Sequence, residues 1–269
     1  MKAILTLLDF SDASTNALSF AAEISKRTDA RLVLINIIQK GGDEEETKNR
    51  LKSIESDLRK SYDSDFKCES TIAHGNLIST LKKVIAIQQP DLIVMGTKGA
   101  SGLKRILIGS NTVNVIAKTK VPVLVIPEVA RFEHFLQKGK NRIVFATDLE
   151  EMENDTALHI LKEVALLVID PRLSVLSVRP KDTNLPNLKR KEREFLVSFF
   201  NDEIKSDQAT VFSDNVISGI NFYLSQKNMD AGLIAMIARD TGQFKRHYTR
   251  EMASLTHLPL LVLHDTKIS

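Results

Sequence analysis

The sequence predicts an α/β protein made of two tandem, doubly wound parallel sheets of five strands each. Apolar, strand-like runs alternate with segments of helical periodicity, and this alternation occurs twice along the chain. The length of 269 residues also suits two domains, at roughly 150 residues per domain. Strands that alternate with helices imply right-handed crossovers and a parallel sheet covered on both faces.

The first half contains five expected strands and four expected helices. Each strand is short and apolar, and each helix places its apolar residues on one face. The expected strands are Ala3–Leu8, Arg31–Ile38, Phe66–Ala73, Leu92–Met95 and Val121–Ile126. The expected helices run from Ser11 or Asp12 to about Thr28, over Glu44–Tyr62, through the stripe Leu77 to Ile85, and over Ser110–Lys118.

The second half repeats this order after a polar stretch. Arg142 to Asp148 echoes Lys2 to Asp9, and Leu258–Leu263 matches the Val121–Ile126 strand. Between them we expect strands at Leu173–Val178, Ala209–Phe212 and Leu233–Ala238, and helices over Asn154–Val168, Leu188–Ile204 and Val216–Gln226. The predicted organisation is therefore a domain at 1–127, a linker at 128–140 and a second domain at 141–269.

Composition narrows the class of protein. Hydrophobic residues make up 43% and charged residues 26%, which is ordinary for a globular chain. The net charge of +3 and the lack of a dense basic patch argue against a nucleic-acid partner. No apolar run approaches the roughly 20 residues of a membrane span, so we expect a cytoplasmic protein. The single cysteine, Cys68, rules out an intrachain disulfide and reads as a small strand residue.

A glycine pattern follows the fourth strand of the first half. The apolar run ends at Gly96, Gly99 and Gly109 follow, and Ser110 stands where a helix should begin. Glycine lets the backbone approach a ligand closely, and a helix N-terminus offers unpaired N–H groups. The pattern therefore indicates a phosphate cradle beside Asp9, which ends the first strand. The alternative is a glycine-rich turn with an ordinary serine cap.

Asp9, the spacing of the glycines and Ser110, and the closing Val121–Ile126 strand together resemble the universal stress protein family. The resemblance extends over both halves. It implies binding of ATP, and it implies a role for each matching residue of the first half. Asp9 would contact the ribose, the backbone of Ile37 would hold adenine, and Gly96 would pack under the ribose and triphosphate. The positions that would line the phosphates are Gly99, Gly109, Ser110 and Asn111.

The same resemblance implies Mg²⁺, held mainly by phosphate oxygens and water rather than by a metal site of the protein. No catalytic residue is identified: Ser110 has no evident His or Asp partner, so hydrolysis is expected to be slow at most. One departure concerns Leu8, because the family often has Thr or Ser before the aspartate. That departure puts nucleotide affinity in question.

The second half departs further from the family pattern. Ile237 stands at the position of Gly96, and Arg246 and His247 stand at those of Gly109 and Ser110. Asp148 remains but reads as a helix cap or an inherited residue, so no second ATP site is expected. The repeated architecture with a degraded motif keeps an alternative open: an interaction scaffold of the same fold that binds no nucleotide.

The strands Val121–Ile126 and Leu258–Leu263 read as sheet edges, which invite pairing. The resemblance implies that such strands pair domains, here within one chain as a pseudo-dimer. A further homodimer and an unidentified protein partner are weaker expectations. His247, His257 and His264 read as scattered surface histidines, although Arg239, Arg246 and His247 could bind an anion. His74 reads as a loop histidine that could approach a nucleotide.

Overall fold

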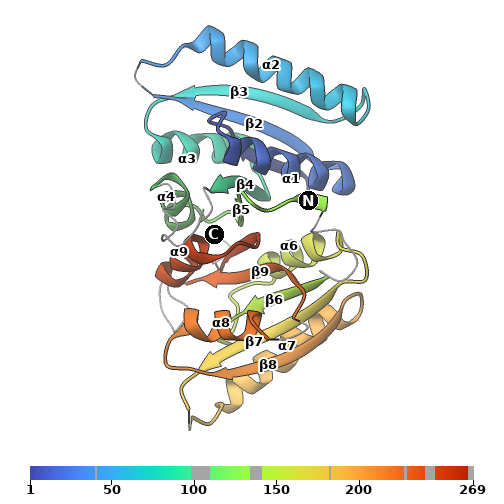
Figure 1. The fold of residues 1–269 in the computed structure, drawn as a ribbon, viewed down its shortest axis with the longest axis vertical. Coiled ribbons are helices and arrows are strands. Elements are labelled where there is room, and N and C mark those ends of the chain that lie inside the picture. The colour runs from blue at the N-terminus through green and yellow to red at the C-terminus, as the bar shows by residue number, and fades with distance from the viewer. Residues whose placement is uncertain are drawn as a thin grey trace.

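Ten strands form one continuous sheet in the computed structural model of the chain (Figure 1). The structure describes residues 1–39, 41–97, 110–133, 141–181, 183–226, 229–239 and 246–265. The strands are β1 (Ala3–Leu7), β2 (Arg31–Ile38), β3 (Cys68–His74), β4 (Leu92–Thr97), β5 (Val123–Pro127), β6 (Arg142–Ala146), β7 (Arg172–Arg179), β8 (Lys205–Phe212), β9 (Ala231–Ala238) and β10 (Leu260–His264).

The helices occupy the expected connections between strands. They are α1 (Asp12–Thr28), α2 (Glu44–Ser61), α3 (Leu77–Gln88), α4 (Ser110–Lys118), α6 (Thr156–Ala165), α7 (Asn187–Asn201), α8 (Val216–Leu224) and α9 (Arg246–Leu255). The prediction for α4 is confirmed residue for residue. The helix α9 is not among the predicted elements: its segment is polar on average, although Tyr248, Met252 and Leu255 recur at helical spacing.

The strand order is β3-β2-β1-β4-β5-β10-β9-β6-β7-β8, so each half has the same five-stranded parallel order. The halves join where β5 and β10 pair antiparallel, with Leu124 opposite Leu261. This confirms the predicted pairing of the two closing strands within one chain. The backbone groups of each closing strand are thereby paired, so neither strand is left as an exposed edge.

Helices cover both faces of the sheet, and each face carries one hydrophobic cluster that runs through both halves. Residues of α1, α2, α6 and α7 pack on one face. Residues of α3, α4, α8 and α9 pack on the other. β1 and β4 are neighbours, but the helices that follow them lie on opposite faces of the sheet. The chain connections therefore diverge at the carboxyl edge between these strands, which is where doubly wound sheets bind ligands.

Part of the predicted linker packs against the first half. The side-chain amide of Asn16, on α1, donates to the carbonyls of Pro127 at 3.1 Å and Ala130 at 2.9 Å. Phe132 is buried and meets Phe20 edge to face at 5.2 Å. Residues 128–133 are therefore anchored on α1 rather than solvated, and residues 134–140 lie outside the described chain.

Candidate functional site

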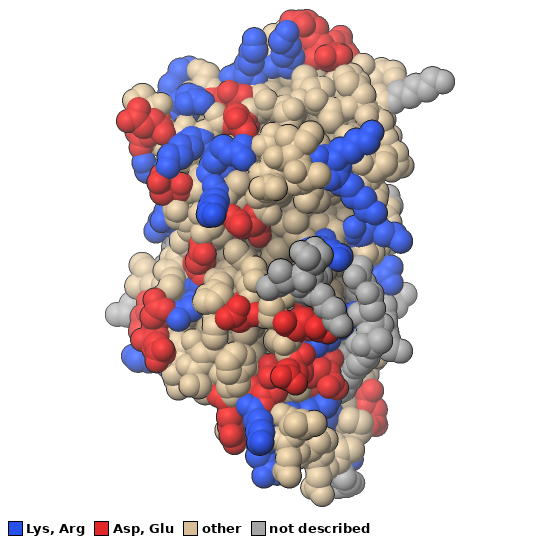
Figure 2. Space-filling view, turned by 180° about the vertical axis from the view of Figure 1, so that it is seen from behind, with Lys and Arg blue, Asp and Glu red and all other residues tan. Residues whose placement is uncertain are grey.

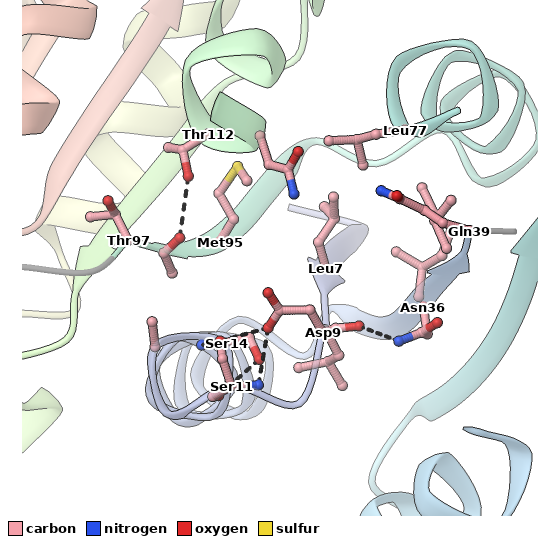
Figure 3. Close-up of a pocket in the computed structure, with 16 residues that line it drawn as sticks. Leu7, Asp9, Ser11, Ser14, Asn36, Gln39, Leu77, Met95, Thr97 and Thr112 are labelled. Atoms are coloured by element: carbon pink, nitrogen blue, oxygen red, sulfur yellow. Dashed lines mark hydrogen bonds between the residues drawn. The ribbon is translucent and has the colours of Figure 1, made fainter. Parts of the chain in front are cut away.

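A cavity of about 360 Å³ lies at the carboxyl ends of β1, β2 and β4 (Figure 3). Its volume falls in the range of roughly 300–1,000 Å³ that is common for small-molecule sites. The first turns of α1 and α4 also border it. The lining residues are Leu7, Leu8, Asp9, Ser11, Ala13, Ser14, Ile35, Asn36, Ile37, Gln39, Leu77, Met95, Gly96, Thr97, Asn111 and Thr112.

Asp9 presents an ionised carboxylate to this cavity. Its Oδ1 accepts hydrogen bonds from the backbone N–H of Ser11 at 3.0 Å and from the Ser11 hydroxyl at 2.6 Å. Burial acts to raise the pKa of the Asp9 carboxyl, but the hydrogen bonds from Ser11 outweigh burial and lower it. The side chain is exposed, so a ligand hydroxyl can reach an anionic acceptor held in place by the start of α1.

Gly96 allows α1 to start close to β4. A Cβ atom at this position would lie 2.1 Å from the carbonyl oxygen of Ala13 and 2.9 Å from the backbone nitrogen of Ser14. No side chain fits there without moving the first turn of α1. The glycine is thus required by helix–strand packing as well as by any ligand that uses the cavity.

Polar groups from β2, β4 and α4 complete the lining. The Asn36 side chain donates to the carbonyl of Leu8 at 2.7 Å, which ties β2 to the end of β1. The Thr112 hydroxyl donates to the carbonyl of Gly96 at 3.3 Å. The Thr97 hydroxyl is buried and has no hydrogen-bond partner among the residues that the structure describes. These groups give the cavity a hydrogen-bonding rim over an apolar floor.

The structure brings together four of the seven residues predicted for this site: Asp9, Ile37, Gly96 and Asn111 all line the cavity. Gly99 and Gly109 lie outside the described residues. The backbone of Ser110 opens α4 as predicted, but its side chain is not among those described. The role of each residue toward a ligand stays a prediction.

The sequence did not reveal several other lining residues. Gln39 follows a continuous apolar strand, Thr97 follows Gly96 directly, and Leu77 opens α3. A polar residue at the carboxyl end of a buried strand is the signal that could have identified Gln39 and Thr97. Leu77 carried no such signal, because it reads as part of a helix's apolar stripe.

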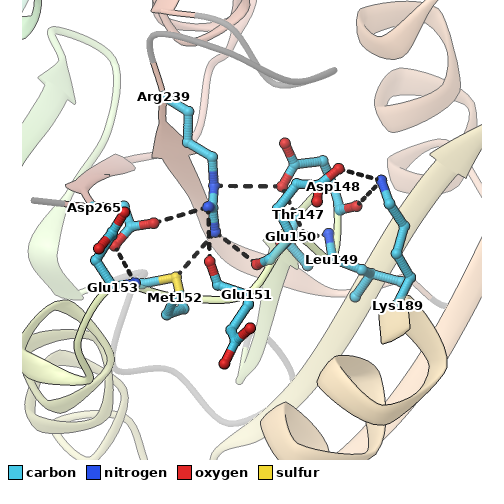
Figure 4. Close-up of polar contacts among 10 residues, drawn as sticks. All are labelled: Thr147, Asp148, Leu149, Glu150, Glu151, Met152, Glu153, Lys189, Arg239 and Asp265. Atoms are coloured by element: carbon cyan, nitrogen blue, oxygen red, sulfur yellow. Dashed lines mark hydrogen bonds and ion pairs between the residues drawn. The ribbon is translucent and has the colours of Figure 1, made fainter. Parts of the chain in front are cut away.

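The corresponding place in the second half is occupied by Arg239, which follows β9 (Figure 4). Its guanidinium Nε lies 3.5 Å from Oδ1 of Asp148, and Nη1 lies 2.8 Å from Oδ2 of Asp265. It also donates to the carbonyls of Glu150 at 2.8 Å and Glu151 at 3.1 Å. Arg239 is therefore enclosed by oxygen acceptors, which disfavours the proposed alternative that it binds an anion.

Asp148 is buried in this network, unlike Asp9. Besides Arg239, its carboxylate accepts from the backbone of Glu150 at 3.3 Å, and Lys189 of α7 donates to its carbonyl at 3.0 Å. Ile237, one residue before the end of β9, is also fully buried. A side chain is therefore buried in the second half at the position where the first half has a glycine packed against the backbone of α1.

The histidines and the cysteine considered in the sequence do not line the cavity where the structure describes their side chains. His74 lies 3.1 Å from Oε2 of Glu44 and does not line the cavity. His264 is buried in β10, so the expectation of a surface histidine was wrong there, because β10 is an inner strand of the joined sheet. Cys68 is buried in β3 as expected, and burial raises the pKa of its thiol to about 12.

Surface charge, metal-ligating groups and helix length were compared with what nucleic acids, metal ions and membranes require. On the face shown in Figure 2, basic and acidic side chains are mixed over the first half, and acidic ones gather over the second. Among the described residues, no group of three or more His, Cys, Asp and Glu side chains could hold a metal ion. No described helix has the length and apolar content that a bilayer crossing requires.

Comparison with known proteins gives the class to which this fold and cavity belong. The model of the universal stress protein family matches residues 1–127. Universal stress protein MJ0577 of Methanocaldococcus jannaschii is 39% identical over 82 residues, which cover 30% of this chain and 49% of that protein. The match thus spans about half the length of that relative.

A second relative is matched over most of its length. Universal stress protein MJ0531 of the same organism is 30% identical over 141 residues, covering 46% of this chain and 81% of that protein. A crystal structure of a universal stress protein from Archaeoglobus fulgidus superposes over 98% of both chains with a TM-score of 0.74 and 18% identity, which shows the shared tandem fold. The chain belongs to the universal stress protein family.

Proposed function

We propose that the protein is a stress-response regulator that binds one ATP per chain, in the cavity of the first half. The observation that carries this proposal is the juxtaposition of Asp9, Ile37, Gly96 and Asn111 around one cavity of about 360 Å³. These are residues to which the family resemblance assigns nucleotide contacts. The second half, closed by Arg239, would bind none.

The chemistry of the lining suits the parts of a nucleotide. The ionised Asp9 can accept from ribose hydroxyls, and the half-buried Ile37 and Leu77 offer apolar contact to a flat base. The N-terminus of α4, which carries Asn111, points backbone N–H donors toward the place of the phosphates. Mg²⁺ would be held by phosphate oxygens and water, since the described residues offer no metal site of their own.

The direct test is to identify and count the ligand. Protein purified without added nucleotide would be denatured and its released ligand analysed by mass spectrometry, and the emptied protein titrated with ATP and Mg²⁺ by calorimetry. We expect one adenine nucleotide per chain. A universal stress protein with 19% identity to this chain was crystallised in complex with cAMP, so cAMP is titrated in parallel. Two sites per chain would show that the second half is open after all.

Asp9→Asn tests the role of the carboxylate. A hydrogen bond to a charged group contributes about 1.5 to 3 kcal/mol, so we expect ATP affinity to fall about tenfold or more. Asp12→Asn is the matched control, because Asp12 is an exposed aspartate of the same turn that does not line the cavity. Equal affinity of both variants and the wild type would remove Asp9 from the site.

Gly99→Val with Gly109→Val discriminates this proposal from the scaffold alternative: if ATP binding is absent before the substitutions and unchanged after them, the scaffold alternative is favoured. We expect at most slow ATP hydrolysis, because no residue of the cavity is placed as a catalytic base in the described chain. A cytoplasmic location, a protein partner and a homodimer stay predictions that follow from the family resemblance.

A further inference from the structure

One end of the cavity, where the base of a nucleotide would lie, is bordered by β2 and α3. Ile37 of β2 and Leu77 of α3 are half-buried, pack on the same hydrophobic cluster and line the cavity. Side chains alternate along a strand, so Ile35, Ile37 and Gln39 project to the same side. Gln39 comes directly after β2, and Figure 3 shows its side chain reaching into the cavity near Leu77.

The Gln39 amide is available to a ligand. It makes no hydrogen bond with any residue that the structure describes, and the side chain is exposed. Its neighbour Asn36 differs, because the Asn36 Nδ2 already donates to the carbonyl of Leu8 at 2.7 Å. Gln39 therefore offers one donor group and one acceptor at the open edge of this otherwise apolar end of the cavity.

We propose that Gln39 reads the edge of the base and selects adenine over guanine. This proposal rests on nucleotide binding in the first half and adds a side chain that determines specificity. Adenine presents the N6 donor beside an N7 acceptor, which a glutamine amide can pair with both. Guanine presents O6 and N7, two acceptors, so the amide oxygen would face a lone pair instead of an N–H group.

The test compares affinities for ATP and GTP, both with Mg²⁺, by calorimetry. The proteins are the wild type, Gln39→Ala and the control Gln208→Ala, a glutamine exposed on β8 at the far edge of the sheet. Since a bidentate amide–base contact discriminates by about 1–3 kcal/mol, we expect Gln39→Ala to reduce the ATP-to-GTP preference about tenfold. Gln208→Ala should keep the wild-type preference. Urea midpoints verify that all three proteins are equally folded.

The outcomes separate this proposal from the one on which it rests. If the wild type binds ATP but shows no preference over GTP, or if Gln39→Ala keeps the full preference, Gln39 does not read the base and nucleotide binding stands. If the wild type binds neither nucleotide, nucleotide binding itself fails, and base selection by Gln39 fails with it. An ATP-over-GTP preference that is lost in Gln39→Ala but kept in Gln208→Ala supports both nucleotide binding and base selection by Gln39.

Discussion

The two halves place an aspartate at the end of their first strand and use it in opposite ways. Asp9 is exposed at the rim of a cavity and accepts hydrogen bonds only from its own turn among the bonds described. Asp148 is buried beneath Arg239 and is linked through Lys189 to α7. The same position therefore serves an open site in one half and an internal salt bridge in the other.

The two halves also differ at the position of Gly96, where the second half has Ile237. Gly96 lies opposite Ile126 in β5, and Ile237 lies opposite Leu263 in β10, so the two positions correspond. Gly96 lets α1 start at Asp12, close to β4. Ile237 carries a buried side chain at this position, and α6 starts only at Thr156, further along the chain from Asp148 than α1 is from Asp9. The second half therefore lacks the close approach of a helix start to this strand that Gly96 permits in the first half.

The largest effect is expected for Arg239→Ala. This guanidinium forms ion pairs with the buried carboxylates of Asp148 and Asp265, and the substitution removes both pairs. Breaking a buried ion pair from one side costs about 3–5 kcal/mol, so we expect the free energy of unfolding to fall by that amount in urea denaturation.

A control variant and a double variant test whether the effect of Arg239→Ala comes from the buried ion pairs. Arg172→Ala removes an exposed arginine at the start of β7 and should change stability by less than about 0.5 kcal/mol. Adding Asp148→Asn to Arg239→Ala should restore part of the loss, because one buried negative charge disappears. An Arg239→Ala variant as stable as the wild type would show that the network contributes nothing.

Gly96→Ala should have the next largest effect, in the first half. The new Cβ atom would meet the backbone of Ala13 at 2.1 Å, and overpacking of this kind costs about 1–3 kcal/mol. Gly41→Ala is the comparison, because Gly41 has a φ of 92° but a Cβ added there would meet no atom within 4 Å. It should lose only about 1 kcal/mol from backbone strain. Equal losses would mean that the close approach of α1 is not the reason for the glycine.

The smallest effect concerns pH and Glu192 of α7, which faces the Arg239 network. Its Oε1 is buried without a hydrogen-bond partner among the described residues. Burial raises the pKa of Glu192 to about 7; Arg239 acts to lower it, and Glu151 and Asp265 act to raise it. Asp148, which pairs with Arg239, and Glu150, which pairs with Lys189 on the same helix as Glu192, are further charged groups of this network.

The direction of the pH effect on stability follows from whether the folded or the unfolded state keeps the Glu192 proton. Between about pH 4.5 and 7 the folded protein holds the Glu192 proton and the unfolded chain has released it, so stability falls as pH rises through this window. We expect a loss of about 1–2 kcal/mol after allowance for solvent screening. Glu192→Gln should remove this slope in urea midpoints measured from pH 4.5 to 8. An unchanged slope would assign the pH dependence to other groups.

Much of the fold could be predicted because its signals are local. Apolar runs such as Leu92 to Met95 and the stripe of α3 reflect burial directly, and the alternation of strands and helices predicts a parallel sheet with right-handed crossovers. Asp9 and Gly96 stand at strand ends, whereas Ile37 and Asn111 were identified through the resemblance to the family. The helix α9 was missed because its segment is polar on average, although its Met252 and Ala253 are buried.

The closed second site could not be predicted in the same way. The loss of the glycines indicated that a cradle was missing, but Arg239, Asp148 and Asp265 are far apart in the chain. Their contact depends on β6, β9 and β10 ending side by side. The availability of Gln39, and the use of Asn36 within the protein, likewise depend on side-chain directions that no spacing shows.

Local sequence was enough to establish two α/β halves, because burial and turn chemistry depend on neighbouring residues. The pairing through the closing strands and most of the site residues were predicted from the resemblance to the family. Only the tertiary structure decided that one crevice is open and the other is closed. The physical reason is that both outcomes depend on contacts across the sheet: a backbone carbonyl 2.1 Å from a missing Cβ in the first half, and a guanidinium between two buried carboxylates in the second.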